Sequence, residues 1–187
     1  MPNALAASEI RVAPSGTIYI APAGTAVPST ISAAWTGFNQ LGYASEDGVK
    51  LSRGMDTEMV KGWQSISTLR YLITGVTLTA AFTLLQTNKD VIPLYFGGGS
   101  ITNQGGGSFK FDISSAPAVD ERVFGVEWVD GSFTYRLTIP RVMVTDTGET
   151  TVGRSDAIQW PFTLSAMSPS TGSVLGTLIT NDSAAFS

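Results

Sequence analysis

Paired carboxylates are the residues of this sequence whose type and spacing could do acid–base chemistry. The chain has no cysteine and no histidine, which excludes disulfide chemistry, thiolate nucleophiles, Cys/His zinc sites and Ser-His-Asp triads. Acidic residues remain close together at 46–47, 120–121 and 146–149, and carboxylates can act as general acids or bases. Each group lies in a turn-like segment, where acids commonly cap and solvate the backbone. We therefore expect no catalytic residue.

Metal and cofactor sites are also poorly supported by the motifs. Asp146, Thr147 and Glu149 offer oxygen ligands within one short loop, but they lack the D-x-D-x-D-G spacing of a calcium loop. The glycine-rich segment 97–107 lacks the GK[ST] signature of a phosphate-binding loop. We expect no metal and no cofactor.

Tryptophans raise the question of ligand stacking, because carbohydrate modules stack sugars on exposed aromatic rings. Trp128 and Trp160 lie in alternating apolar segments, which favours a place in the core. Trp63 instead follows Lys61 and Gly62 in a charged segment. There it is either an anchor in a protein–protein contact or part of the packing that folds its own loop, and the sequence leaves both readings open.

Composition narrows the class of protein further. Hydrophobic residues make up 43% of the 187 residues, charged residues only 14%, and the net charge is −4. An average soluble domain has about 25% charged residues, so the low value suits surfaces that are buried against other copies. Basic residues form no cluster, which argues against tight binding of nucleic acid.

The elements that must position these residues are mostly strands. Apolar and polar residues alternate through 69–85, with Ala80, Phe82 and Leu84 on one face and a bend or bulge expected at Gly75. Asp130-Gly131 between two alternating segments predicts a hairpin. A short helix is expected at 87–96 with Thr87 as its cap. We read the glycine-rich residues 97–108 as a mobile loop.

The fold class is therefore mainly β: an antiparallel β-sandwich or open barrel of eight to ten strands with one short flanking α-helix. Length predicts one domain. We expect a flexible N-terminal arm at 1–15, a single β domain at 16–167 and a loose C-terminal tail at 168–187. Neither a signal peptide nor a membrane span is expected, and the missing cysteines fit a reducing cytosol.

Residues 45–65 form a long excursion that holds seven charged residues and alternates too weakly for a core hairpin. We expect it to be only partly strand, and long loops of this kind are usually functional. The Thr-rich strands carry few charges, so their edges have little protection against pairing with other chains. Both features favour a subunit of an ordered assembly.

The first half of the chain contains a series of distinctive motifs: G-T-I-Y-I-A-P at 16–22, L-G-Y-A-S-E-D-G-V at 41–49, the Lys61-Gly62-Trp63 step, Arg70, F-T-L-L-Q-T-N-K-D-V at 82–91 and L-Y-F-G at 94–97. In this order they resemble the major tail protein, or tail tube protein, of long-tailed non-contractile bacteriophages. The second half is similar in pattern only, with hairpin strands and a final strand that contains a Trp.

The resemblance implies a structural subunit that forms rings, usually hexamers, whose inner sheets join into one β-barrel. The rings stack into a hollow tube, and genomic DNA passes through its lumen into the host without specific binding. The implied partners are further copies of the chain, a tape measure protein, a tail terminator and baseplate proteins. The implied location is the virion tail, after synthesis in the bacterial cytoplasm, with no membrane contact.

Two sets of residues carry this implied assembly. The inter-ring stacking loop would contain Glu46, Asp47, Lys50, Arg53, Asp56, Glu58, Lys61 and Trp63. Strand pairing between subunits would involve Leu69, Tyr71, Thr77, Thr79 and Thr83. The charges that face the lumen are not assigned. Two alternatives stay open: another virion ring component, such as a tail completion or baseplate hub protein, and a ligand-binding β-sandwich or carboxylate enzyme.

Overall fold

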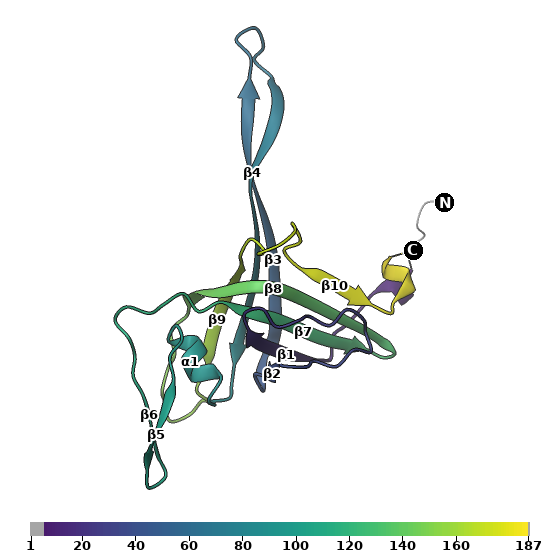
Figure 1. The fold of residues 1–187 in the computed structure, drawn as a ribbon. Helices are drawn as coiled ribbons and strands as arrows, with labels where there is room; N and C mark the ends of the chain where they lie inside the picture. The colour runs from purple at the N-terminus through teal and green to yellow at the C-terminus, as the bar shows by residue number, and fades with distance from the viewer. Residues whose placement is uncertain (1–5, 187) are drawn as a thin grey trace.

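Ten β-strands and one short α-helix form the framework of the described part of the chain, residues 6–186 of the computed structural model (Figure 1). The strands are β1 (Ser15–Pro22), β2 (Asn39–Gln40), β3 (Ala44–Lys61), β4 (Thr68–Leu84), β5 (Ile101–Gly105), β6 (Ser108–Phe111), β7 (Arg122–Asp130), β8 (Phe133–Thr147), β9 (Trp160–Ala166) and β10 (Thr177–Thr180). The helix is α1 (Val91–Tyr95), and 3-10 turns lie at Ala7–Glu9 and Ser183–Ala185.

One antiparallel sheet contains all strands except β5 and β6. Its order is β2-β1-β7-β8-β9-β4-β3, and β10 pairs with β8 as a branch. β8 is long enough to change neighbours along one edge, since β10 pairs with Tyr135–Thr138 and β9 pairs with the later part from Val142. The predicted class, mainly β and antiparallel with one short helix, is confirmed, and its form is an open sheet.

The hydrophobic core lies on the inner face of this curved sheet. The alternation predicted for β4 is confirmed at Ala80, Phe82 and Leu84, which are all buried. The Phe82 ring stacks between those of Phe124 and Phe162, at centroid distances of 5.7 and 5.5 Å. The other buried members come from β1, β7, β8, β9, α1 and the β2–β3 connection: Ile18, Ile20, Leu41, Val91, Leu94, Val126, Leu137, Ile139, Val142, Trp160 and Leu164.

Helix α1 covers one end of the core and is shorter than the sequence predicts. The expected cap at Thr87 is wrong, because the Thr87 hydroxyl instead accepts a hydrogen bond from Trp160 Nε1 at 3.0 Å. Asn88 Oδ1 accepts from the backbone N–H groups of Asp90 and Val91 at 2.9 and 3.0 Å. The Asn88 side chain thus takes the role expected of the threonine, and the helix begins at Val91.

The glycine-rich segment is not a loop without strands, which corrects the expectation for 97–108. β5 and β6 pair antiparallel and form a small hairpin that projects away from the sheet. Gly106 and Gly107, with φ of 59° and 80°, form its turn. Residues with positive φ at both central positions of a two-residue turn match the twist of the strands, and glycine adopts this conformation without steric cost.

The outer face of β1, β7 and β8 is covered by the 23–38 connection. Arg136 anchors it, since its guanidinium donates to Glu127 Oε2 at 2.5 Å and to the carbonyl oxygens of Thr30 and Ala33 at 3.0 and 2.5 Å. Trp35 stacks on Tyr19 at 4.3 Å between ring centroids. Buried Arg136 has its charge paired with Glu127, as a charge removed from water requires.

Both ends of the described chain meet at the β7–β8 hairpin. Asp182 is buried and accepts from Arg11 Nε at 2.6 Å and from the Tyr135 hydroxyl at 2.5 Å. The hydrogen bond from Arg11, followed by that from Tyr135, lowers the pKa of Asp182 to about 2. Because β10 pairs with β8, the prediction of a loose tail at 168–187 is wrong for Thr177–Thr180. Residues 1–5 of the predicted N-terminal arm lie outside the described residues, and the domain limits stay a prediction.

Candidate assembly interface

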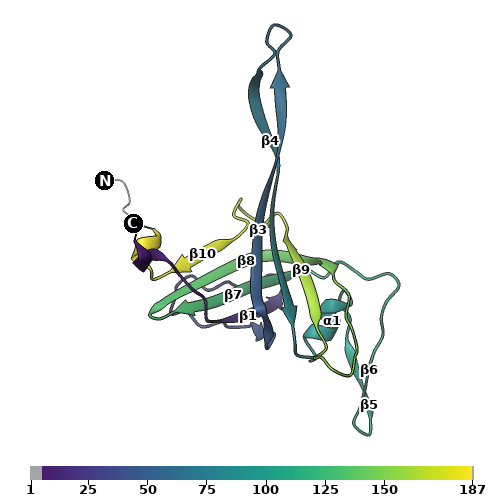
Figure 2. The same cartoon turned by 180° about the vertical axis from the view of Figure 1, so that it is seen from behind.

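β3 and β4 continue beyond the sheet as a two-stranded projection. β9 accompanies β4 only from Thr79 to Leu84, so residues 53–78, here called the arm, stand away from the rest of the molecule (Figures 1 and 2). At 3.3 Å per residue, the strands carry the arm about 30 Å beyond the sheet. The arm and the β5–β6 hairpin point in opposite directions (Figure 2).

The arm corrects the expectation of an excursion that is only partly strand. β3 is continuous from Ala44 to Lys61 and pairs with β4 at Ala44 and then from Val49 to Lys61. Its residues alternate weakly because most of them lie outside the core, where no burial selects one apolar face. The predicted irregularity at Gly75 is confirmed, since the register shifts between the pairs Asp56–Gly75 and Thr57–Ile73 and leaves Thr74 without a partner.

One face of the arm is mostly apolar, with Arg53 as a charged member near its base, and it continues the face of the sheet that carries the core. Cross-strand partners share a face, and the pairs Met55–Val76 and Met59–Tyr71 follow Leu51–Ala80, whose alanine is buried in the core. Ile73 pairs with Thr57 on the same face. These side chains are 40–63% exposed, and we call them the apolar face of the arm: Met55, Met59, Tyr71, Ile73 and Val76.

The opposite face of the arm is mostly small or charged. It carries the pairs Gly54–Thr77, Asp56–Gly75, Glu58–Leu72 and Val60–Arg70. A Cβ on Gly54 would lie 2.5 Å from Thr77 Oγ1, so the threonine hydroxyl occupies the space above the glycine. The two faces of one hairpin therefore differ in chemistry.

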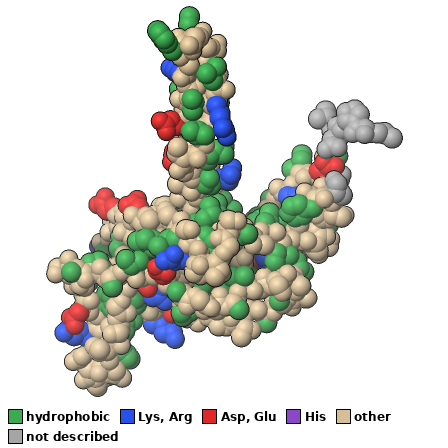
Figure 3. All heavy atoms as spheres, turned by 45° about the horizontal axis from the view of Figure 1, so that its top comes forward, with side chains coloured by type: hydrophobic (Ala, Val, Ile, Leu, Met, Phe, Trp, Pro, Cys, Tyr) green, Lys and Arg blue, Asp and Glu red, His purple; other side chains and the backbone are tan. Residues whose placement is uncertain are grey.

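The tip of the arm, residues 62–67, presents two large apolar side chains. Trp63 is 98% exposed and Ile66 103% exposed. The Ser65 N–H donates to the Gly62 carbonyl at 3.3 Å and closes a turn. Trp63 packs against nothing in its own loop, so it does not help to fold that loop. Its other predicted role, as an anchor in a contact with another chain, stays a prediction. Figure 3 shows hydrophobic side chains along the arm and at its end.

The structure divides the predicted stacking-loop residues between two places. Arg53, Asp56, Glu58 and Lys61 lie on the arm and Trp63 at its tip, whereas Glu46, Asp47 and Lys50 lie on the part of β3 that belongs to the sheet. Lys50 Nζ donates to Asp47 Oδ2 at 2.7 Å, and this hydrogen bond lowers the pKa of Asp47.

The predicted strand-pairing residues also fall into two groups, those beside β9 and those in the arm. At Thr79 both edges of β4 are paired, with Ser52 of β3 and Ser165 of β9. Thr83 pairs with Pro161 of β9, and on its other side it lies between Phe82 and Leu84, which both pair with β3. These two residues cannot pair with a strand of another subunit, which corrects their assignment. Leu69, Tyr71 and Thr77 lie beyond the end of β9, where β4 keeps one edge without a strand partner among residues 6–186.

Sequence reasoning missed Ile66 and the apolar face of the arm. The sequence does contain a signal for this face. Apolar residues lie on both sides of 62–67, and a hairpin turn there would pair Met55 and Met59 with the apolar residues of 71–76. Reading 45–65 as a loop prevented that pairing from being considered.

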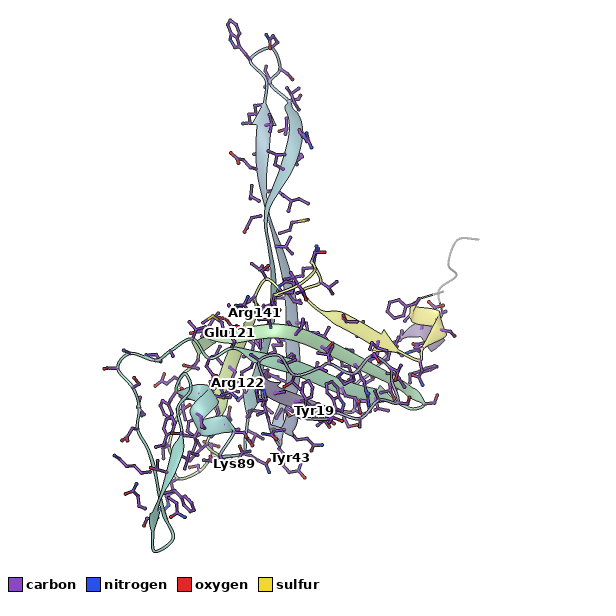
Figure 4. The ribbon with its side chains drawn as sticks, in the orientation of Figure 1. Tyr19, Tyr43, Lys89, Glu121, Arg122 and Arg141 are labelled. Carbon is purple, nitrogen blue, oxygen red and sulfur yellow. The ribbon has the colours of Figure 1, made fainter. Side chains whose placement is uncertain are left out.

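Two of the acidic residues that are adjacent in the sequence, Asp120 and Glu121, are each engaged in an ion pair. Arg141 donates to both carboxylate oxygens of Glu121, from Nε at 2.8 Å and from a terminal nitrogen at 2.5 Å, and this lowers the pKa of Glu121 (Figure 4). Asp120 pairs with Arg122 at 2.8 Å. Across residues 6–186, acidic side chains form no group of three that could hold a metal ion. The acids of this region thus brace the fold.

Fold and surface together define a structural β-protein with an extended surface for contact with other protein chains. The chain belongs to the phage tail tube protein family, whose sequence model matches residues 3–187. This confirms the resemblance seen in the first-half motifs, and membership gives the chain a structural role in the tail and a place in the virion.

Comparison with solved structures finds a likeness to a chain in "Virion of native gene transfer agent (GTA) particle". The two share 11% sequence identity with a TM-score of 0.42, over 75% of this chain and 88% of the other. A search of curated proteins finds no match. Within residues 6–186, no helix has both the length and the apolar character needed to span a membrane.

Proposed function

We propose that this chain is the repeating subunit of a tail tube. Copies form rings, expected to be hexameric, which stack into a hollow conduit through which genomic DNA is ejected into the host. The observation that carries the proposal is the arm, which exposes an apolar face and an apolar tip to solvent. Large contiguous apolar surfaces of this kind mark sites of protein–protein contact.

Backbone edges of the arm support the same assembly. Among the described residues, no strand pairs with the outer edge of β3, and β4 has one free edge from Thr68 to Leu78. Free edges of this length are templates for pairing with another chain. Pairing β3 of one copy with the free edge of β4 in the arm of the next copy, repeated around a ring, leaves both edges of every arm paired.

The charge of the chain fits a conduit in which DNA slides. The net charge is −4, and a wall without clustered Lys or Arg releases no counterions from DNA and so holds it weakly. Several reversals of acidic residues to Lys should therefore slow DNA delivery. Unchanged delivery would contradict the proposal that acidic residues of this chain line the lumen.

The test is a variant that lacks the arm but keeps the sheet. Ser52 and Thr79 are cross-strand partners at the base of the arm, so residues 53–78 can be replaced by Asn-Gly, which favours a two-residue hairpin turn. Deleting all of 46–62 would be a poorer test, because Val49 packs against the core.

We expect the natural chain to form long hollow tubes by negative-stain electron microscopy. The armless variant should fold, with a cooperative thermal transition, and form no tubes. Tubes of normal length from the armless variant would refute the assigned role of the arm. Rings alone from the natural chain would favour a tail completion or baseplate hub protein, and monomers at high concentration would favour a ligand-binding protein. The tape measure, tail terminator and baseplate partners stay predictions.

A further inference from the structure

The open side of the curved sheet contains an apolar groove between β1 and β3. It has a volume of about 550 Å³. Ser15 and Gly16 form one wall, and residues 44–46 with Gly48, Val49 and Leu51 form the other. Buried Ile18 and Val126 line it together with Trp128. We call it the seam groove, because the sheet would close at this place if β1 and β3 were paired.

The seam groove is almost free of charge. Of the residues that line it, Glu46 alone is ionisable with a charge at neutral pH, and it is exposed. The remaining lining is apolar, small or a hydroxyl. A groove of this kind fits large apolar side chains from a segment that is itself uncharged.

The tip of the arm is such a segment. Residues 62–68 carry no charge, and Trp63 and Ile66 are fully exposed. Lys61, directly before the tip, is exposed and positive. The tip is therefore an apolar knob next to two bases, Lys61 and Arg70, and the seam groove is an apolar hollow lined by one acid.

A tip cannot reach the groove of its own chain. β3 runs without interruption from Ala44, beside the groove, to Lys61, beside the tip, so the extended strand holds the two apart. A knob and a hollow at different places on one molecule make a heterologous contact, and repetition of such a contact produces an open-ended stack.

We propose that the seam groove receives the arm tip of a second copy of this chain. Trp63 and Ile66 of one copy pack against Ile18 and Trp128 of the next, and Lys61 lies beside Glu46 of that copy. The inference rests on the proposed function, and it adds the surface that accepts the arm.

Cross-linking tests the contact directly, because the natural chain has no cysteine. One batch carries Gln64→Cys at the tip, which leaves Trp63 and Ile66 in place. A second batch carries Ser45→Cys in the groove, and a control batch carries Val152→Cys at a site that is 78% exposed. Batches are mixed, assembled and treated with a short bis-maleimide, and dimers are counted on a denaturing gel.

We expect a covalent dimer from the Gln64→Cys and Ser45→Cys mixture and at most a trace from Gln64→Cys with Val152→Cys. Assembled tubes without the Ser45 cross-link, or with equal cross-linking at Val152, overturn the seam-groove contact and leave the proposed function intact. Failure of the natural chain and of all batches to form tubes overturns both.

Charge exchange provides a second test with surface substitutions that leave the core untouched. Lys61→Glu and Glu46→Lys each place like charges together, and each should raise the critical concentration for assembly about threefold to tenfold. The double variant restores an opposite pair and should return to within about twofold of the natural value. Additive losses in the double variant would overturn the pairing.

Discussion

Truncation of Trp63 to alanine should separate the stability of the subunit from the stability of the tube. The side chain is 98% exposed in the single chain. Substitutions at such exposed positions usually change the free energy of unfolding by less than about 0.5 kcal/mol. The unassembled variant should therefore unfold at nearly the same temperature as the natural chain.

The cost of the Trp63→Ala substitution to assembly follows from the surface area of the indole side chain. A buried Trp removes about 150–250 Å² from water, which at about 25 cal/mol per Å² sets an upper bound of about 4–6 kcal/mol per contact. Ordering costs on association reduce this value, and aromatic anchors lose about 2–4 kcal/mol on truncation. Each 1.4 kcal/mol corresponds to a factor of ten in an equilibrium constant. This loss therefore predicts a critical concentration that is higher by about 30-fold to 700-fold.

The assay is sedimentation of tubes over a series of total protein concentrations, which gives the critical concentration as the plateau of unsedimented protein. Ile66→Ala should show the same direction of change with a smaller size, and Val152→Ala, a comparable loss at a site that is 78% exposed, should show none. A critical concentration for Trp63→Ala within twofold of the natural one would refute the reasoning that the tip is an assembly anchor.

Three further predictions concern the fold. Arg11 lowers the pKa of Asp182 from 3.8 to about 2. The stabilising contribution of Asp182 is therefore complete above about pH 4 and is lost as pH falls towards 2. Chemical denaturation at pH 4 and pH 2 should show a smaller decline in the free energy of unfolding for Asp182→Asn than for the natural chain. Gly125→Ala places a Cβ 2.4 Å from Trp35 Cζ3, and should destabilise by about 1–3 kcal/mol with a change in Trp fluorescence; an unchanged spectrum would show that Trp35 does not lie on this glycine. Phe124→Ala removes a fully buried ring and should cost about 3–5 kcal/mol in urea unfolding, whereas a loss under 1 kcal/mol would contradict the described core.

The parts of the fold that the sequence predicted are those in which the chain buries its own side chains. Alternation through Ala80, Phe82 and Leu84 identified a strand because the core selects every second residue. Asp130-Gly131 predicted the β7–β8 hairpin, and Asp130 indeed pairs with Phe133 around Gly131, whose φ is 58°.

The parts that the sequence did not predict lack that internal selection. In the arm, β3 has no core to face, so its apolar residues Met55 and Met59 are spaced among charges and look like a loop. In the β5–β6 hairpin, adjacent glycines at 105–107 suggest flexibility, although Gly106 and Gly107 form the turn. β10 is short and pairs with the long β8, a non-local contact that periodicity cannot report.

The candidate interface shows the same limit. Charges at 46–61 and Trp63 drew attention to the segment that contains the arm, but the division between the sheet and the arm depends on where β9 ends. That boundary also removed Thr79 and Thr83 from the edge available to other subunits. To place the boundary between the sheet and the arm, one must know how β3, β4 and β9 pair with one another.

Helical reconstruction of the purified, assembled protein by electron cryomicroscopy tests the central claim most directly. The account predicts a hollow tube of stacked rings in which each arm is covered by neighbouring copies and Trp63 lies in a contact between chains. Tubes in which the arms extend into solvent would contradict this account, and so would a preparation that stays monomeric at high protein concentration.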